Sequence, residues 1–356
     1  MRVIPVDKVK PGMIVERAII GSTGEILLNK GVYIDARYIQ RLKDIGVPAI
    51  YVRDENIGKV EYDEVVSNQT RLEALSVARD VVTNLRLRSD FDIRRVNKVV
   101  DDLVSELVTS RDLLVALVDM RAANDEGFYH SVNTTVLSVI TGLGMGYNDK
   151  QLRQLACGAL FHDIGVILLP PELLKKPTPL SPEENKQILK HPELGFQILR
   201  KKEGVSLMSA HVALQHHEKF DGSGYPRGLA GDEICEYARI VAIAAIYDNF
   251  VGLGSNKQLV LPHQAIQYLI KYGGIWFDPE ILKVFVGIIA VFPIGSVVQL
   301  NSGVQALVTR ANKNYPSRPV VRVFKNRVGA RVAPPFEIDL EANPEYFIQT
   351  IVVEEP

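Results

Sequence analysis

The stretch Phe161-His162-Asp163-Ile164-Gly165 decides how this sequence is interpreted. It ends an apolar run, residues 152–161, and places an imidazole directly beside a carboxylate. Such a pair suits a divalent metal, because imidazole is a neutral nitrogen donor and the carboxylate is an anionic donor that can bridge two ions. A single His-Asp dipeptide usually makes only a surface hydrogen bond. Its meaning here depends on where the other histidines lie.

All seven histidines lie between residues 130 and 263, and five of them fall into an ordered series. Glu126 and His130 are four residues apart in a stretch with helical apolar spacing, so both project from one helix face. The pair His191-Pro192 predicts the start of a helix, because proline is favoured in the first turn. The series continues with Gln215-His216-His217-Glu218, the loop Asp221-Gly222-Ser223-Gly224-Tyr225-Pro226 and an apolar helix over residues 238–248 that carries Asp248.

The composition is that of an ordinary soluble globular protein. The 356 residues contain 41 Lys and Arg against 42 Asp and Glu, so no overall field favours DNA, RNA or an anionic membrane surface. The two cysteines lack the spacing of a disulfide framework or a thiolate zinc site. The N-terminus has no signal-peptide core, and the longest apolar stretch, about residues 281–293, is too short for a membrane span. These features predict a cytoplasmic location.

The segments on either side of the histidines have different patterns. Residues 1–60 combine short strand-like runs with a helix over residues 35–45, which predicts a small α+β module for docking or dimerisation. Residues 61–119 show helical apolar spacing without a polar cluster, so we expect a helical connector and consider it a candidate homodimer interface. Residues 294–356 alternate apolar and polar positions between Gly and Pro turns, which predicts a small β module. The histidine-bearing region, residues 120–293, is helical in pattern.

The order and spacing of these motifs resemble those of the HD-GYP family. The resemblance covers about residues 120–291 and is carried by blocks that are specific to that family: His162-Asp163-Ile164-Gly165, residues 170–180, His191-Pro192-Glu193, His216-His217-Glu218 and residues 222–229 with Gly224-Tyr225-Pro226. It implies a mainly α fold, in which an HD-type metallohydrolase core lies between the two small modules. It also implies a bacterial signalling phosphodiesterase that opens cyclic di-GMP to linear pGpG or GMP.

The same resemblance implies the roles of individual residues. Two or three divalent ions, commonly iron or manganese, would be held by Glu126, His130, His162, Asp163, His191, His216 and His217. His162 and Asp163 would be catalytic through these ions. Gly224, Tyr225, Pro226 and Lys257 would contact the substrate. The chemistry of the residues agrees, because imidazoles suit iron, manganese, nickel or zinc and two neighbouring ions can hold a phosphodiester and activate water.

The sequence departs from the family pattern at three positions. The resemblance implies an Asp ligand at position 245, a Lys at 166 and an Arg at 254, where this chain has Ala245, Val166 and Gly254. The site that includes His130 and His162 would therefore lack one carboxylate, and the substrate phosphates would lack two cationic contacts. Two functions follow as hypotheses. One is an active phosphodiesterase, and the other is a degenerate member that binds metal, nucleotide or a protein partner and signals through its accessory modules.

Several residues also have purely structural interpretations. A lone histidine such as His211 or His263 usually makes ordinary surface or core contacts, and Cys157 lies in an apolar run. The Glu126 and His130 pair could be a surface ion pair. Residues 222–226 alone could form any turn. Asp248 could orient a ligating histidine or cap a helix, so we do not assign it as a ligand.

Overall fold

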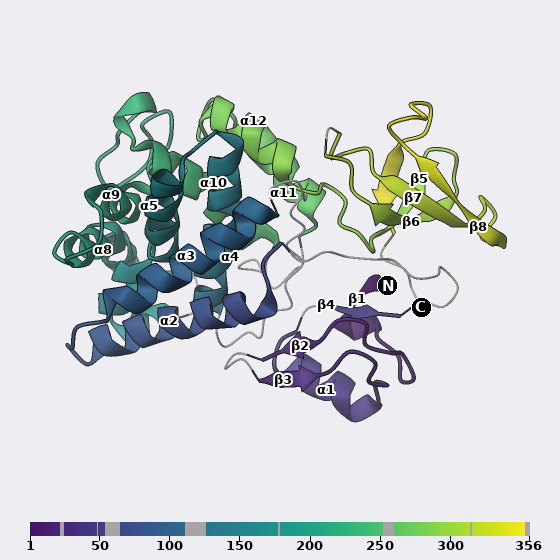
Figure 1. Cartoon of the computed structure of the whole chain (residues 1–356), viewed down its shortest axis with the longest axis horizontal. Coiled ribbons are helices and arrows are strands. Elements are labelled where there is room, and N and C mark those ends of the chain that lie inside the picture. Colours follow the sequence, from purple (N-terminus) through teal and green to yellow (C-terminus); the bar gives the residue numbers. More distant parts are fainter. Residues whose placement is uncertain are drawn as a thin grey trace.

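The computed structural model describes residues 1–21, 25–47, 49–53, 65–110, 126–176, 179–251, 260–313 and 315–352. The chain forms a helical body, a small α+β module from its N-terminal part and a β module from its C-terminal part (Figure 1). The expectation of a mainly α fold is confirmed: the chain has a helical core and a small antiparallel sheet near the C-terminus.

The N-terminal module contains two short antiparallel strand pairs and one helix. Strand β1 (Arg2–Pro5) pairs with β4 (Ala49–Val52), and β2 (Ile19–Ile20) pairs with β3 (Ile26–Leu28). The 3-10 helix η1 (Val6–Lys8) follows β1, and helix α1 (Ala36–Asp44) begins after Asp35, whose side chain accepts a hydrogen bond from the Tyr38 amide. Strand β2 is shorter than the strand-like run over residues 13–20, in which Ile14 and Val15 form only isolated bridges.

The helical body begins with two long helices that follow N-cap residues. Helix α2 (Asn68–Arg86) begins after Ser67, and α3 (Ile93–Thr109) begins after Asp92. The remaining helices of the body are α4 (Glu126–Gly144), α5 (Asp149–Leu160), η3 (Ile164–Leu168), α6 (Pro171–Lys175), α7 (Pro182–Ile188), α8 (His191–Leu199), α9 (Leu207–Gln215), η4 (Gly231–Glu233), α10 (Glu236–Val251), α11 (Pro262–Lys271) and α12 (Pro279–Ile288).

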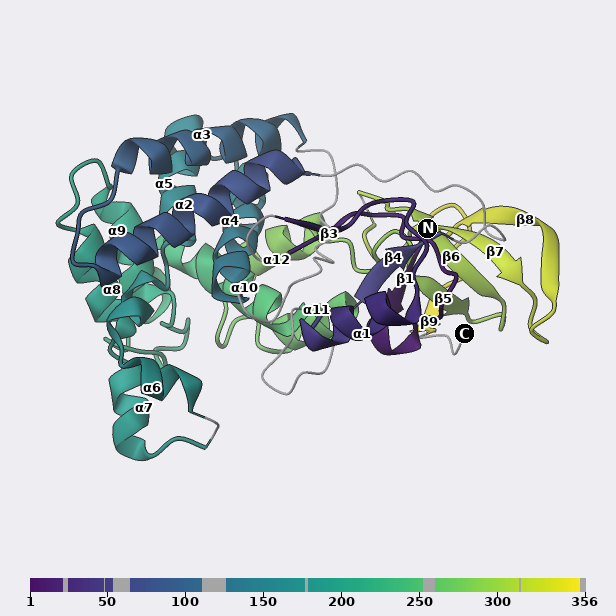
Figure 2. The ribbon, with the colours of Figure 1, turned by 90° about the horizontal axis from the view of Figure 1, so that it is seen from below.

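Helix α4 lies at the centre of this body. It packs against α2, α3, α5, α10 and α12, and its polar side chains at Asn133, Thr135 and Ser138 are fully buried. The apolar faces of α2 and α3 join the same hydrophobic core as α4, α5 and α10. The connector helices therefore cover one side of the helices that carry the histidines. Figure 2 shows α6 and α7 projecting from the opposite end of the body.

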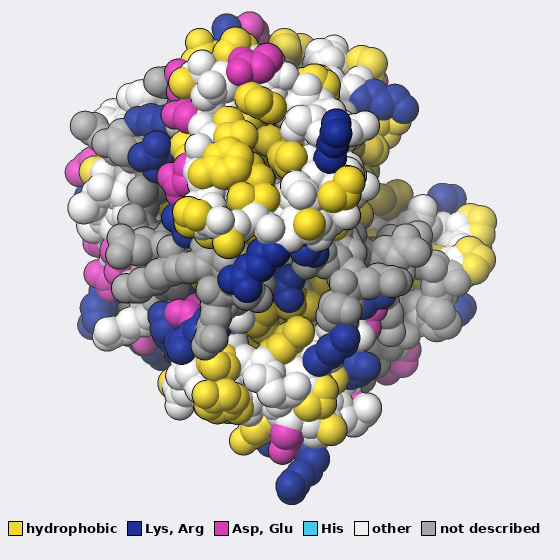
Figure 3. All heavy atoms as spheres, turned by 90° about the vertical axis from the view of Figure 1, so that its right-hand side faces the viewer, with side chains coloured by type: hydrophobic (Ala, Val, Ile, Leu, Met, Phe, Trp, Pro, Cys, Tyr) yellow, Lys and Arg dark blue, Asp and Glu magenta, His cyan; other side chains and the backbone are white. Residues whose placement is uncertain are grey.

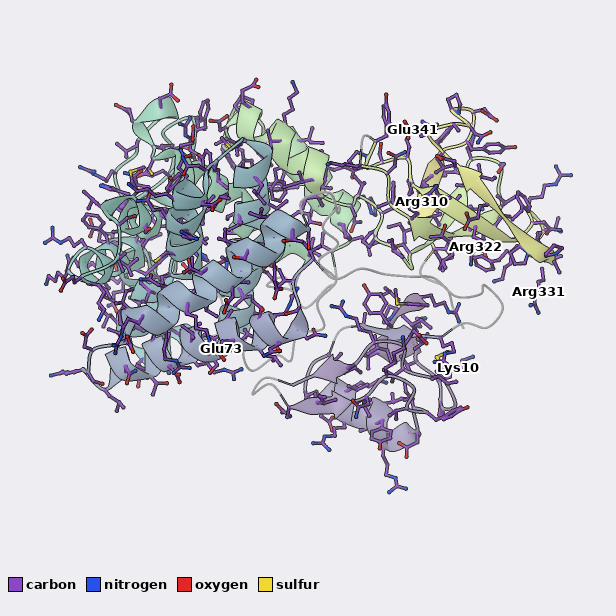
Figure 4. The ribbon with its side chains drawn as sticks, viewed as in Figure 1. Lys10, Glu73, Arg310, Arg322, Arg331 and Glu341 are labelled. Atoms are coloured by element: carbon purple, nitrogen blue, oxygen red, sulfur yellow. The ribbon has the colours of Figure 1, made fainter. Side chains whose placement is uncertain are left out.

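The C-terminal module is a five-stranded antiparallel sheet. Its strands are β5 (Val297–Leu300), β6 (Gln305–Arg310), β7 (Val320–Lys325), β8 (Arg331–Asp339) and β9 (Ile348–Ile351), in the order β8-β7-β6-β5-β9. Arg310, Arg322 and Arg331 lie on this sheet (Figure 4), and Arg322 pairs with Glu337 across β7 and β8 at 2.8 Å. Figure 3 shows the molecule from the right-hand side of Figure 1, and hydrophobic side chains gather on the upper part of this face.

Hydrogen bonds between described residues connect the N-terminal module to the rest of the chain. The amide of Val3 donates to the carbonyl of Gly295 at 3.2 Å, and the buried Tyr129 hydroxyl of α4 donates to the carbonyl of Gly21 at 3.2 Å. The domain boundaries at residues 60, 119 and 293 stay a prediction. Among the described helices, none is both long and apolar enough to cross a membrane.

Candidate metal centre

The five histidines of the series lie at the ends and on the inner faces of helices that converge on Asp163. His162 and Asp163 follow the C-terminal end of α5, where Phe161 is the C-cap. His191 is the first residue of α8, and His216 and His217 follow the last residue of α9. His130 lies one turn into α4. Residues that are up to 87 positions apart in the chain are thus brought to one point.

Gly165 allows the segment after Asp163 to pack directly against the start of α8. A Cβ at this position would overlap with the carbonyl oxygen of His191 and the amide nitrogen of Gly195. No residue other than glycine fits between these backbones without displacing one of them. The glycine of the His-Asp-Ile-Gly motif therefore sets the distance between Asp163 and His191.

The first set of metal-binding atoms comes from Asp163, His191, His216 and His217, whose donor atoms all lie within 4.8 Å of one another. Oδ1 of Asp163 is 3.3 Å from Nε2 of His191 and 3.2 Å from Nε2 of His216. Nε2 of His191 is in turn 3.1 Å from Nε2 of His217. One carboxylate oxygen and three imidazole nitrogens therefore face a common point.

The second set comes from His130, His162 and Asp163. Here the other carboxylate oxygen is used, because Oδ2 of Asp163 is 3.4 Å from Nε2 of His162. Nε2 of His130 lies 3.2 Å from Nε2 of His162. The two oxygens of Asp163 thus point to different sets, which is the arrangement expected of a carboxylate that bridges two ions.

Hydrogen bonds at the Nδ1 atoms fix the orientation of the imidazole rings. Nδ1 of His162, His191 and His216 each lies 2.8–3.0 Å from a backbone carbonyl three residues earlier, at Ala159, Ile188 and Ala213. A carbonyl can only accept, so each of these Nδ1 atoms carries the hydrogen and each Nε2 presents a lone pair to the centre. This is the usual outer contact of histidines that bind metals.

The geometry fits divalent ions. Nitrogen atoms about 2.1 Å from a shared ion, at ligand angles near 90–110°, are separated by about 3.0–3.4 Å. The Nε2 separations of 3.1, 3.2 and 3.4 Å fall in this range. Without a cation, neutral imidazoles would point lone pairs at one another. The donor sets therefore suit one ion on each side of Asp163.

Burial keeps the site ready to bind a cation. It lowers the pKa of His162 to about 3 and that of His217 to about 2, the neighbouring imidazoles adding to the effect on His217. Desolvation acts to raise the pKa of Asp163, but the surrounding imidazoles of His162, His191 and His216 outweigh it and hold this pKa well below its usual value. At neutral pH the His162 and His217 imidazoles are therefore neutral and the Asp163 carboxylate is charged, as metal ligation requires.

Helix α10 carries an acidic residue next to the second set, and this residue contacts the outer nitrogen of a histidine instead of facing the centre. Asp248 is 1% exposed, and its Oδ2 lies 2.7 Å from Nδ1 of His130. It therefore orients His130, one of the two roles that the sequence left open. Ala245 is buried one turn earlier on the same helix. The carboxylate that the family resemblance implied at this position is thus replaced by a methyl group, on the same helix as Asp248.

The glycine-rich loop closes over His217. The Tyr225 ring stacks on the His217 ring with centroids 4.6 Å apart, and the Tyr225 amide donates to the His217 carbonyl at 3.2 Å. A Cβ on Gly224 would overlap with the Lys219 amide nitrogen and the His217 carbonyl. Pro226 follows Tyr225 in a cis peptide. The three residues of the Gly-Tyr-Pro motif are therefore placed beside the first set.

Some residues named from the sequence lie apart from the centre or outside what is described. Glu126 begins α4, but its side chain is outside the described part of the structure, as are Lys257 and Gly254. Val166 lies in η3, half-buried, three residues after Asp163. His211 lies against Phe196, and His263 stacks on Phe292, so neither joins the two donor sets.

Three polar side chains that support the centre were given no role from the sequence. Glu218 is 4% exposed, and its carboxylate accepts hydrogen bonds from the amides of Arg227 and Leu229, which holds the loop in place. Asn133 donates to Asp248, and Arg71 donates to Asn133. The spacing of Asn133, three residues after His130 and so on the same helix face, was a usable signal. Arg71 carried none.

Comparison with known families gives two adjacent matches. The model of the HD domain matches residues 113–281, and that of the KOW domain associated with the HD domain matches residues 297–355. The first match contains both His162-Asp163 and Gly224-Tyr225-Pro226. The structure places these two motifs around one centre. Residues 113–281 are an HD domain with the motifs of the HD-GYP type.

Curated relatives come from several bacteria. A cyclic di-GMP phosphodiesterase of Pseudomonas aeruginosa is 27% identical over 75% of this chain, and the phosphodiesterase PdeB of Borreliella burgdorferi is 30% identical over 55%. A cyclic di-GMP phosphodiesterase of Thermotoga maritima is 32% identical over 52% of the chain. These matches cover 63%, 52% and 49% of the relatives' own lengths.

Proposed function

We propose that this protein is a metal-dependent phosphodiesterase that hydrolyses cyclic di-GMP in bacterial second-messenger signalling. The observation that carries the proposal is the pair of donor sets that share Asp163 beside the Gly-Tyr-Pro loop. The relatives that hydrolyse cyclic di-GMP by name support the choice of substrate. Cytoplasmic cyclic di-GMP would be the small-molecule partner.

In this proposal His191, His216 and His217 hold one divalent ion, His130 and His162 hold another, and Asp163 joins them. Bound ions would supply Lewis-acid stabilisation of the phosphoryl oxygens and activation of water. Iron or manganese suits the imidazole-rich set. Glu126 and a third ion would complete the set implied by the family. His162 and Asp163 are the catalytic pair in this sense, because they fix where the ions lie.

The chain's own residues would orient the substrate. The Tyr225 hydroxyl stays protonated at neutral pH, because burial raises its pKa. It can donate a hydrogen bond to a phosphate oxygen beside His217. Gly224 and Pro226 shape the loop so that its backbone can approach the ligand closely. Lys257 would supply a cationic contact to phosphate.

A second candidate function rests on the two substitutions that the structure describes. Ala245 offers no donor to the second set, and Val166 offers no cation next to Asp163. A protein with one complete donor set could bind metal and nucleotide without turnover, and act as a receptor or as a scaffold for a signalling protein. A homodimer through α2 and α3 would be the simplest assembly for such a role, and light scattering that shows a monomer at micromolar concentration would contradict it.

One experiment separates the two functions. The protein is purified without oxygen, its metal content is measured, and cyclic di-GMP turnover is followed with added iron or manganese, with Asp163→Asn as the control. Metal-dependent formation of pGpG or GMP supports the phosphodiesterase. Metal and cyclic di-GMP binding without turnover supports the receptor.

A further inference from the structure

A series of hydrogen bonds, buried at Asn133 and Asp248, runs from the connector helix α2 to the second donor set. Nη1 of Arg71 donates to Oδ1 of Asn133 at 3.2 Å. Nδ2 of Asn133 donates to Oδ1 of Asp248 at 3.0 Å, and Oδ2 of Asp248 lies 2.7 Å from Nδ1 of His130. This series of hydrogen bonds therefore joins α2, α4 and α10 and ends on His130, a candidate metal ligand.

Each hydrogen bond in this series has only one possible direction. Arginine is only a donor, so the Asn133 oxygen must face Arg71 and its NH2 group must face Asp248. The Asp248 carboxylate is only an acceptor, so it keeps the hydrogen of His130 on Nδ1 and leaves Nε2 as the metal-binding atom. Asn133 is 0% and Asp248 is 1% exposed, so water does not compete with these bonds.

The Arg71 end of the chain is held by a separate contact between α2 and α3. The Glu106 carboxylate of α3 accepts hydrogen bonds from the amide and hydroxyl of Ser67 at 2.7 and 3.0 Å and from the Thr70 hydroxyl at 2.5 Å. These residues form the N-cap and first turn of α2. Arg71 is the next residue, so the position of this turn decides whether the guanidinium reaches Asn133.

We propose that Arg71, through Asn133 and Asp248, is a positioning residue for the second metal site, so that the connector helix controls how well His130 binds its ion. The proposal deepens the proposed metal centre. Residue 71 lies before the segment matched by the HD domain, residues 113–281, so the control comes from an accessory segment. The second site depends on it strongly, because with Ala245 in place of a carboxylate it has few other ligands to hold the ion.

The direct test is a metal titration that resolves two binding events. Arg71→Met keeps the apolar part of the side chain and removes the guanidinium group. Asp248→Asn removes the negative charge at nearly constant size. Outer contacts of metal ligands typically change affinity by about 10- to 100-fold, so we expect a loss of that size at the weaker site for Asp248→Asn and about 3- to 10-fold for Arg71→Met. The stronger site, held by His191, His216 and His217, should keep its affinity.

The matched control is Arg86→Met, at the exposed other end of α2, about 22 Å along the helix. Glu73, two residues beyond Arg71, is also exposed and lies at the lower edge of the helical body (Figure 4), so Glu73→Gln tests whether any charge change near the start of α2 has the effect. Both controls should leave both binding events unchanged.

A second readout does not involve metal. In metal-free protein, nitrogen-15 NMR reports which ring nitrogen of His130 carries the hydrogen. We expect the Nδ1–H form in the parent and a mixture of forms in Asp248→Asn and Arg71→Met. Unchanged tautomer and unchanged weak-site affinity in Arg71→Met would overturn the proposal. Because neither readout uses turnover, an inactive protein would refute the phosphodiesterase without affecting this result.

Discussion

Replacing Ala245 by Asp restores the carboxylate that the second donor set lacks, and the effect on stability should reverse when metal is added. Position 245 is 7% exposed and lies one turn from Asp248 on α10. Side chains so placed are about 5–6 Å apart. Two carboxylates at 6 Å repel by about 3 kcal/mol at an effective dielectric constant near 20. Metal-free Ala245→Asp should therefore unfold at a temperature roughly 6–12 °C lower than the parent.

With ions present the added carboxylate becomes a ligand. An outer contact alone is worth about 10-fold in affinity, so a direct ligand should tighten the second site by at least about 10-fold, or about 1.4 kcal/mol. Thermal unfolding is compared with chelator and with excess manganese, and metal content is measured after dialysis. Ala245→Asn, of nearly the same size but uncharged, is the control. Equal destabilisation of Ala245→Asp with chelator and with manganese would refute the assignment of this position to the metal centre.

Three further predictions test other parts of the centre. Asp163→Asn should lower metal content at both sites, because the two oxygens of Asp163 serve different sets, and elemental analysis that shows the loss of only one ion would contradict the shared role. Gly224→Ala should abolish turnover but retain metal, because its Cβ overlaps with backbone at Lys219, and activity within about twofold of the parent would exclude this loop from the substrate site. The metal-free protein should lose stability as the pH drops below about 6.5, because the pKa values of His162 and His217 are lowered in the folded protein and the unfolded chain binds the protons more readily. Each histidine lowers the free energy of unfolding by up to about 1.4 kcal/mol per pH unit. Equal urea midpoints at pH 7 and pH 5 would contradict this prediction.

The proximity of these side chains could be anticipated from the sequence because the motifs are short and most belong to the end of one helix. His162-Asp163 and His216-His217 each place two side chains by local geometry alone, at the ends of α5 and α9. The division into two sets sharing Asp163 followed from the family pattern, and the structure brings those residues together in these sets.

Contacts between distant segments could not be predicted in the same way. Arg71 meets Asn133 only because α2 packs on α4, and amphipathic spacing says which face of α2 is buried but not what it meets. The role of Asp248 stayed open because a buried acid on an apolar helix can orient a ligand or cap a helix. The strand-like run over residues 13–20 forms a strand only at Ile19–Ile20, with isolated bridges at Ile14 and Val15.

Anomalous scattering from crystals grown with manganese tests the metal centre most directly. The account predicts two peaks about 4 Å apart. One should lie against His191, His216 and His217 and the other against His130 and His162, with an oxygen of Asp163 next to each. A structure without a peak at Asp163, or with a single ion that Asp163 does not contact, would contradict the two-site centre.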